Sequence, residues 1–319
     1  MISRSTLVGA LVVTELVILA AAGQAISGGG PAYASGSTPG THKHFGIVFD
    51  NYGGRHHDAP AAASTVDRTF AAGLTPHVVV DVSDVPVTVQ TGNLPAVHVV
   101  GIVRRSGFRH AEDGVITAVQ TADGVRVTAG GTSDVRGSFE RTLRLTVPPG
   151  ALVEIASGGA IEATGLRAKL IAHVEDGAIH VTNHRGDVDV KTASGDVDLV
   201  DVQAGAIAAH TDDGHVKLTS VGADHFDVHT ASGAIVATDL RAVDGALTAS
   251  DGAVGVTFAA NSDANVHVHT GDGDITGAGP APQTTESAET RTLRLGSGRG
   301  SFTVSTESGS ITISQGATV

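Results

Sequence analysis

Apolar and polar residues alternate with a period of two over most of the chain from residue 151 onward. Short phrases such as EDGAIHV, ASGDVDL, DDGHVKL and ESGSITI recur around a glycine that follows Asp or Ser. Aligned on that glycine, the anchor positions are Gly159, Gly177, Gly195, Gly214, Gly233, Gly252, Gly273 and Gly309. Because alternation of period two is typical of a half-buried strand, each unit predicts two short β-strands around a D-G or S-G corner.

The spacing of the units predicts how they are arranged. The anchors follow one another at steps of 18, 18, 19, 19, 19, 21 and 36 residues. Two residues after the anchor lies an aliphatic column: Ile161, Ile179, Val197, Val216, Ile235, Val254, Ile275 and Ile311. Seven residues after it lies a shorter one: Leu166, Val202, Val221 and Leu240. Successive circuits therefore lie above one another, with about 4.7–4.9 Å between paired strands.

We therefore predict an all-β fold, a parallel β-solenoid of the right-handed β-helix-like kind, with coils of 18–19 residues. The main rival is an antiparallel sandwich, which does not require a constant spacing with one glycine phase. The last step of 36 residues is twice 18, so we interpret it as two coils, one of which has lost its glycine. Eighteen residues before Gly309 lies Arg291, and Leu293 and Leu295 then fall in the inward columns.

Four segments follow from composition and pattern. Residues 1–25 contain an apolar run and predict a signal peptide or membrane anchor. Residues 26–74 are rich in Gly, Ser, Pro and Ala and predict a flexible linker. Residues 75–150 contain less regular strands and predict an entry or cap region, because the ends of a solenoid need covering. Residues 151–319 are the solenoid repeats.

The amino-acid composition limits the kinds of core, functional site and partner that the chain can have. Aromatic residues make up 3% of the chain and Cys and Trp are absent, so the core consists of small aliphatic side chains and Thr. Without Cys there is no disulfide, thiolate metal site or thiol nucleophile. Twenty basic against 33 acidic residues give a net charge of −13, and a phosphate backbone would repel such a chain. We therefore expect no nucleic-acid partner.

The phrases also resemble a known family. SGD(V/I)xV units, a VPPG turn at 147–150 and the closing segment LGSGRGSFTVSTESGSITIS are similar to the bacterial putative-adhesin β-strand-repeat family, a domain family of unknown function. The resemblance covers about residues 75–314. It implies a β-helical body and an adhesive or envelope-associated role, and it supplies no catalytic residues.

One column suggests a metal site. His173, His210, His229 and His269 each lie four residues before an anchor, between inward positions, so their side chains point outward. His210 and His229 fall on adjacent coils, with Asp227 on the same face, and these three residues are the candidate ligands for Zn²⁺ or Ni²⁺. The alternative is a solvated polar face. Since three ligands of fixed geometry are not evident, we expect no resident cofactor.

The acidic corners suggest an enzyme. Asp176, Asp213, Asp251 and Asp272 each precede an anchor glycine. Stacked Asp on a β-helix is a feature of polysaccharide lyases and hydrolases, which need paired carboxylates in a groove. The alternative is that Asp and Ser cap tight turns. The tight corners and the few aromatic residues favour turn capping, so we assign no catalytic residue.

The expectation is therefore a non-enzymatic β-repeat protein of the cell envelope, acting as an adhesin or structural interaction surface. It would be exported and either membrane-anchored or secreted to the cell wall, with a glycan or protein surface of the envelope as its partner and a membrane contact through residues 1–25 if these are uncleaved. The alternatives are a carbohydrate-active β-helix enzyme and a His-lined metal-binding envelope protein.

Overall fold

A computed structural model describes residues 62–106, 116–129, 138–277 and 289–316, which form strands and turns without a helix. In this part of the chain no helix is therefore long or apolar enough to cross a membrane. The segment 1–25 and most of the expected linker lie outside the described residues. The strands are β1 (Ala62–Ala71), β2 (His77–Val82), β3 (Val87–Thr91), β4 (Ala96–Ser106), β5 (Ile116–Gln120), β6 (Gly124–Ala129), β7 (Ser138–Val147), β8 (Leu152–Ser157), β9 (Ile161–Thr164), β10 (Leu170–Val174), β11 (Ile179–Arg185), β12 (Val188–Ser194), β13 (Val197–Asp213), β14 (Val216–Ser232), β15 (Ile235–Leu240), β16 (Asp244–Asp251), β17 (Val254–Phe258), β18 (Ala264–Asp272), β19 (Ile275–Thr276), β20 (Thr290–Arg294), β21 (Gly300–Ser308) and β22 (Ile311–Gln315).

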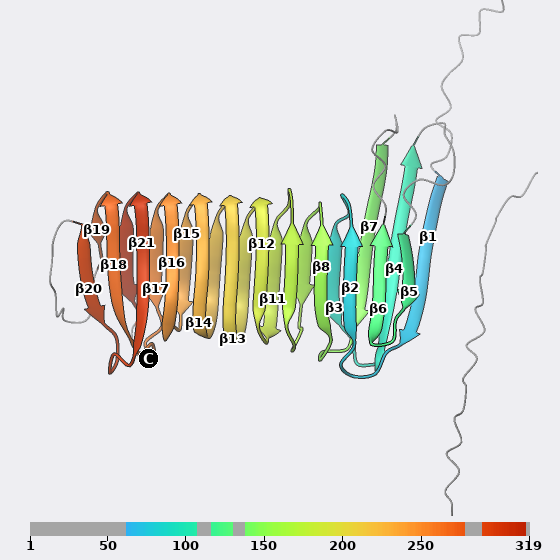
Figure 1. Cartoon of the computed structure of the whole chain (residues 1–319), viewed down its shortest axis with the longest axis horizontal. Helices are drawn as coiled ribbons and strands as arrows, with labels where there is room; N and C mark the ends of the chain where they lie inside the picture. The colour runs from blue at the N-terminus through green and yellow to red at the C-terminus, as the bar shows by residue number, and fades with distance from the viewer. Residues whose placement is uncertain (1–61, 107–115, 130–137, 278–288, 317–319) are drawn as a thin grey trace, which may run out of the picture. The chain divides into compact units, whose positions relative to one another are not determined.

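The strands build two walls (Figure 1), and the buried aliphatic side chains of the core lie between them. Wall A contains β6, β2, β8, β10, β12, the second halves of β13 and β14, β16, β21 and β18. Wall B contains β7, β3, β9, β11, the first halves of β13 and β14, β15, β17, β22 and β19. These strands pair in parallel. Ile179 lies opposite Val197 and Val197 opposite Val216, all three buried, which confirms the predicted stacking of coils at 18–19 residues.

The anchor corner explains the conserved phase of the glycines within the repeats. The hydroxyl of Thr211 donates to the carbonyl of Gly195 in the preceding coil at 3.0 Å, and Thr230 donates to Gly214 at 2.9 Å. The corner backbones approach so closely that a Cβ placed on Gly214 would overlap the Gly195 carbonyl oxygen. Steric room between coils therefore selects glycine at Gly214, and at Gly233, Gly273 and Gly309 a positive φ of 152–156° adds a backbone conformation that other residues rarely adopt.

The second corner uses a left-handed residue instead. β13 and β14 run from wall B to wall A without a break, and each bends at one residue of positive φ, Asp201 at 52° and Ser220 at 54°. Asn183 and Asp239 occupy the equivalent place in neighbouring coils, with φ of 50° and 57°. Asn, Asp and Ser suit this position because their short side chains tolerate a left-handed backbone and bond locally.

The terminal coils are interleaved rather than stacked in sequence order. The first coil, β2–β3, lies between β6–β7 and β8–β9, and the last coil, β21–β22, lies between β16–β17 and β18–β19 (Figure 1). Phe302 of β21 stands opposite Gly245 of β16, and its ring meets Phe226 at 5.9 Å and Phe258 at 5.7 Å between centroids. The phenyl ring fills the space that Gly245 leaves in its inward column, which favours β21 over β18 as the neighbour of β16.

This order corrects the interpretation of the 36-residue step. Residues around Arg291 form β20, which pairs antiparallel with β18 and places Leu293 opposite Val266. They are not a parallel coil that has lost its glycine. Leu293 and Leu295 are nevertheless buried. Period-two alternation is the same for either strand direction. The pattern therefore predicted which residues point inward, but not whether the strand pairs in parallel or antiparallel.

The N-terminal region is also more regular than expected. β2 and β3 form a coil in register with β8 and β9, while β4 pairs antiparallel with β1 and β7. The strand β1, Ala62–Ala71, lies within the range expected to be a linker, so that range does contain part of the folded body. Val66 and Phe70 pack against the core and account for the ordering of this strand.

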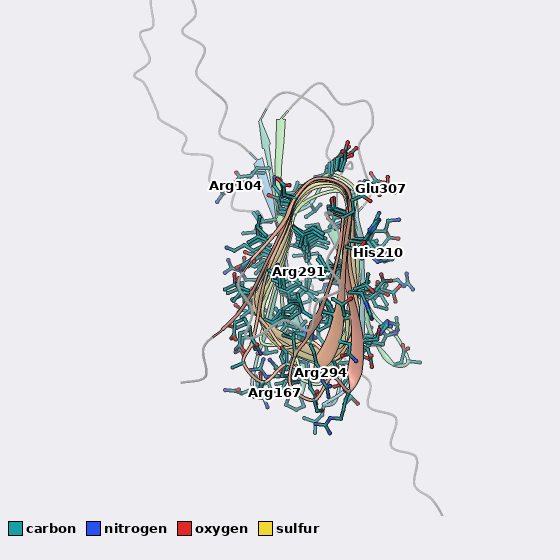
Figure 2. The ribbon with its side chains drawn as sticks, turned by 90° about the vertical axis from the view of Figure 1, so that its left-hand side faces the viewer. Arg104, Arg167, His210, Arg291, Arg294 and Glu307 are labelled. Carbon is teal, nitrogen blue, oxygen red and sulfur yellow. The ribbon has the colours of Figure 1, made fainter. Side chains whose placement is uncertain are left out.

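Long polar side chains close both ends of the core. At the N-terminal end Arg68 of β1 donates to the carbonyl of Ala118 in β5 at 3.2 Å, and Gln120 of β5 donates to that of Ala71 at 2.8 Å. At the other end Arg291 donates to the carbonyl of Gly277 at 3.4 Å, and it lies at the centre of the end view (Figure 2). These bonds satisfy edge carbonyls that would otherwise be open to another strand.

Replacing an anchor glycine tests the role of the corner. We expect Gly214→Ala to destabilise the protein by about 2 kcal/mol, since the added Cβ must push two coils apart. Gly255→Ala is the matched control because a Cβ there meets nothing within 4 Å, and it should stay within about 0.5 kcal/mol of the parent. Denaturant unfolding measures both, and equal stability of the two variants would show that the corner tolerates a side chain.

Cysteine pairs test the interleaved order, since the chain has no native Cys. Thr248 lies opposite Ser305, which in turn lies opposite His269. Neighbouring strands are about 4.8 Å apart and a disulfide needs about 4.4–6.8 Å between Cα atoms. We expect Thr248→Cys with Ser305→Cys to oxidise and Thr248→Cys with His269→Cys to keep free thiols. Thiol titration under denaturing conditions reads the result, and the opposite outcome would place β18 next to β16.

Candidate functional site

A row of basic side chains runs along the outer surface of wall A. His173, Lys191, His210 and His229 lie opposite one another on four successive coils. The inward residues on either side of Lys191 are Val190 and Thr192, both buried, so the alternation turns the row outward as predicted. Thr248 and Ser305 continue the row, and His269 lies beyond them rather than beside His229. We call the four residues His173, Lys191, His210 and His229 the basic row.

The three candidate metal ligands lie together within this surface. His210 Nε2 is 3.3 Å from Asp227 Oδ2, and the rings of His210 and His229 are 6.4 Å apart at an edge-on angle of 87°. Within the described ranges, however, no group of three or more His, Asp or Glu side chains converges in a way that could hold a metal ion. The contact of His210 with Asp227 is a surface ion pair when the ring is protonated, which by itself stabilises the protein little.

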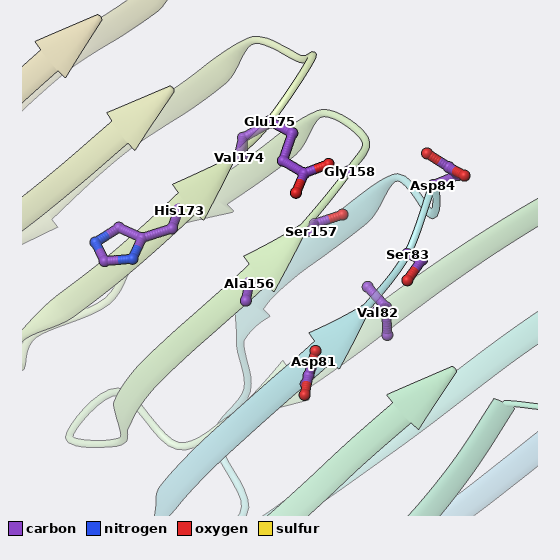
Figure 3. A pocket seen from close by; sticks show the side chains of 10 residues that line it. All are labelled: Asp81, Val82, Ser83, Asp84, Ala156, Ser157, Gly158, His173, Val174 and Glu175. Atoms are coloured by element: carbon purple, nitrogen blue, oxygen red, sulfur yellow. The ribbon is translucent and has the colours of Figure 1, made fainter. Parts of the chain in front are cut away.

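A pocket of about 320 Å³ lies at the N-terminal end of the basic row (Figure 3). It is formed where β2, β8 and β10 end, and His173 belongs both to its lining and to the row. Asp81, Asp84 and Glu175 give the pocket an acidic character. The buried Ser157 hydroxyl donates to the Val85 carbonyl at 2.8 Å and fixes the turn beneath it. The pocket and the row therefore form one continuous polar surface of mixed charge.

A second groove of about 250 Å³ adjoins this pocket on wall A and shares Asp81 and His173 with it. His77 lies between two carboxylates here, 3.3 Å from Glu154 and 3.5 Å from Asp123. A hydrogen bond from the Thr121 hydroxyl is the largest cause that holds the pKa of Asp123 below its ordinary value, and His77 adds to it. This carboxylate therefore stays ionised beside His77.

Asp213, Asp251 and Asp272 lie apart from these pockets, on the exposed ridge of the anchor corner, whereas Asp176 directly follows Glu175 of the first pocket. In space they alternate with serine, in the order Ser194, Asp213, Ser232, Asp251, Ser308 and Asp272. The interleaving of β21 extends this alternation to Asp272, because stacking in sequence order would place Asp251 beside Asp272. Like charges are therefore two strands apart, about 9.5 Å, which limits their repulsion.

Sequence reasoning missed a buried histidine. His184 occupies the column of Leu166 and Val202, seven residues after its anchor, and is fully buried. Neither of its ring nitrogens reaches a hydrogen-bond partner among the described residues. Burial lowers the pKa of His184, and the nearby backbone of Asp187 and Gly186 offsets part of that effect. The column itself could have revealed that His184 is buried. Position 184 falls seven residues after Gly177, and four other coils have a buried aliphatic residue at that place.

The fold and its repeats agree with a family model. The model described as Toastrack DUF4097 matches residues 76–314, most of the chain. The chain belongs to the Toastrack DUF4097 family. This confirms the resemblance seen in the sequence, and it leaves the activity open because the family is one of unknown function.

Solved structures of other bacterial proteins are similar to this Toastrack chain. A putative adhesin from Parabacteroides distasonis has 10% identity and a TM-score of 0.48, with 80% of this chain and 97% of that chain covered. A putative adhesin from Parabacteroides merdae has 12% identity and a TM-score of 0.46, with 80% and 96% covered. One from Bacteroides fragilis has 13% identity and a TM-score of 0.44, with 78% and 97% covered. No curated protein matches the chain.

The buried histidine makes the stability of this Toastrack chain depend on pH. The pKa of His184 is lowered below 6.5 in the folded state, so below pH 6.5 the unfolded chain binds a proton that the folded chain does not. Stability therefore falls as pH drops through 6.5 toward the folded pKa. We expect His184→Val to be more stable than the parent at pH 7.5 by about 1 kcal/mol and by more at pH 5.

Urea unfolding at the two pH values measures this difference. The exposed His173→Thr serves as the control and should keep the acid sensitivity of the parent. If His184→Val loses as much stability between pH 7.5 and pH 5 as the parent does, the buried ring is not the cause.

Proposed function

We propose that the protein is a non-enzymatic component of the bacterial cell envelope that acts as an adhesin-like interaction surface. The observation that carries the proposal is the basic row, four side chains held in register on one face of wall A. A partner with repeating polar groups, a glycan or protein surface of the envelope, would meet several of these side chains at once. Linked weak contacts raise the overall affinity well above that of each one.

The architecture supports such a role. Thr–Gly bonds such as Thr211 to Gly195 lock each corner to the coil before it, and the two ends are closed by Arg68 and Arg291. The outer rows are thus held at a fixed spacing of about 4.8 Å, and little entropy is lost when a partner binds.

The proposal includes the cellular location of the protein. Residues 1–25 would direct export and either be removed or anchor the chain in the membrane, and the body would lie in the cell wall or be secreted. We also propose that the coil is right-handed, as expected from the sequence. The enzyme alternative assigns turnover to the corner aspartates, which lie exposed and alternate with serine.

A pair of matched double variants tests the role of the basic row. Lys191→Ser with His210→Ser removes one Lys and one His from wall A, including the contact of His210 with Asp227. Lys217→Ser with His180→Ser removes the same two residue types from wall B, including the contact of His180 with Asp198 at 3.2 Å. We expect the wall A variant to reduce binding of the purified full chain to envelope polysaccharide or envelope protein by about tenfold, roughly 1.4 kcal/mol. The wall B variant should bind as the parent does.

Equal binding by both variants would contradict a role for the basic row. Release of reducing ends from envelope polysaccharide, lost in Asp213→Ala, would instead favour the enzyme.

A further inference from the structure

A groove of about 470 Å³ lies on the outer side of wall B near the N-terminal end. Its floor is β7, with β3 on one side and β4 on the other. β7 pairs in parallel with β3 and antiparallel with β4, so the regular repeat of the wall is interrupted at this place. The volume is within the range of small-molecule sites, about 300–1,000 Å³. This surface is separate from the basic row of wall A.

Arg144 provides an available positive charge in the floor of this groove. It lies between Thr88 of β3 and Val100 of β4, both uncharged. No ion pair joins it to any described residue, although the protein carries a net charge of −13. The strands β3 and β4 beside Arg144 carry no acidic residue, and Glu140 of β7 and Asp67 of β1 have other partners, Arg104 at 3.2 Å and His98 at 2.8 Å. Glu162 of β9 lies two strands from Arg144, opposite Thr88, and makes no ion pair with it. The guanidinium is therefore free to receive an anion from solution.

The other lining residues supply neutral hydrogen-bonding groups and an apolar patch. Thr88 and Thr142 present hydroxyls, and Gln90 donates from its amide nitrogen to Thr146 at 3.2 Å, which leaves its amide oxygen as an acceptor. Val100 and Ile102 are half-buried in the same wall of the groove. Asp67 fixes the ring of His98 at the end of the lining. The set combines one cation, several hydroxyl or amide groups and exposed aliphatic carbon.

We propose that this groove binds a carboxylated sugar, a uronic-acid unit of an envelope polysaccharide. The Arg144 guanidinium matches a carboxylate with two parallel charge-assisted hydrogen bonds. The hydroxyls of Thr88 and Thr142 and the Gln90 amide pair with sugar hydroxyls, and Val100 and Ile102 cover a C–H face of the ring. A neutral sugar leaves the guanidinium without its anion, and a bare carboxylate leaves the remaining groups unused. Both therefore bind more weakly than the acidic sugar.

Titration calorimetry with the full chain tests the proposal. The probes are oligogalacturonate, the neutral gluco-oligosaccharide of equal length, and acetate. We expect binding of oligogalacturonate at least tenfold tighter than of either of the others. Arg144→Gln should weaken oligogalacturonate binding at least tenfold and leave the thermal unfolding midpoint unchanged, because the side chain is exposed.

Lys217→Gln is the matched control. Lys217 projects from the same outward row of wall B, several coils away, and its replacement changes the net charge by the same amount. It should bind oligogalacturonate as the parent does. Equal weakening by both variants would mean attraction to overall charge and would overturn the site. Equal affinity for the neutral oligosaccharide or for acetate, or no binding of oligogalacturonate, would also overturn it. None of these outcomes bears on the basic row of wall A.

Discussion

The close approach of successive coils at the anchor corner is the constraint on which the rest of the structure depends. The carbonyl of one corner accepts a hydrogen bond from the Thr of the next coil, and no Cβ fits between the two corner backbones, as at Gly214. This contact fixes the phase of each coil against its neighbour. Once the phase is fixed, inward aliphatic residues form columns and outward residues form rows. The registry of His173, Lys191, His210 and His229 is thus a consequence of corner packing and does not require contacts among these side chains.

The interleaving of the first and last coils adds a second constraint. Since β21 lies between β16 and β18, the strand β18 has no hydrogen-bonded partner toward the body until the C-terminal coil is in place. The corner bonds follow the spatial order and not the chain order, because Thr306 donates to Gly252 and Thr270 donates to Gly309, each at 2.8 Å. Pairing of segments distant in sequence is slow to form, so we expect completion of this end to be a late event in folding. In the finished molecule both terminal coils are held on two sides, which limits fraying.

The sequence predicted the coil and its inward residues because side-chain alternation and spacing are local properties. Ile179, Val197 and Val216 were placed correctly for that reason. Strand direction and spatial order are not local, and so β20 was taken for a parallel coil and β1 for part of a linker. His184 was missed because a polar residue in an aliphatic column breaks the pattern used to find the column. The groove around Arg144 depends on the pairing of β7 with both β3 and β4, and residues so far apart in the chain carry no shared motif.

Regularity itself decides where a ligand pocket can form. A wall of identical coils is flat, because each strand repeats the height and direction of the one before it, and its outer rows offer contacts at a constant spacing but no enclosure. Enclosure requires a break in the repeat. All three grooves described above involve the interleaved first coil, β2–β3, and the groove around Arg144 also involves the antiparallel strand β4. The binding proposed for the repeats is accordingly multivalent, whereas the selection proposed for a single chemical unit is assigned to the irregular N-terminal end.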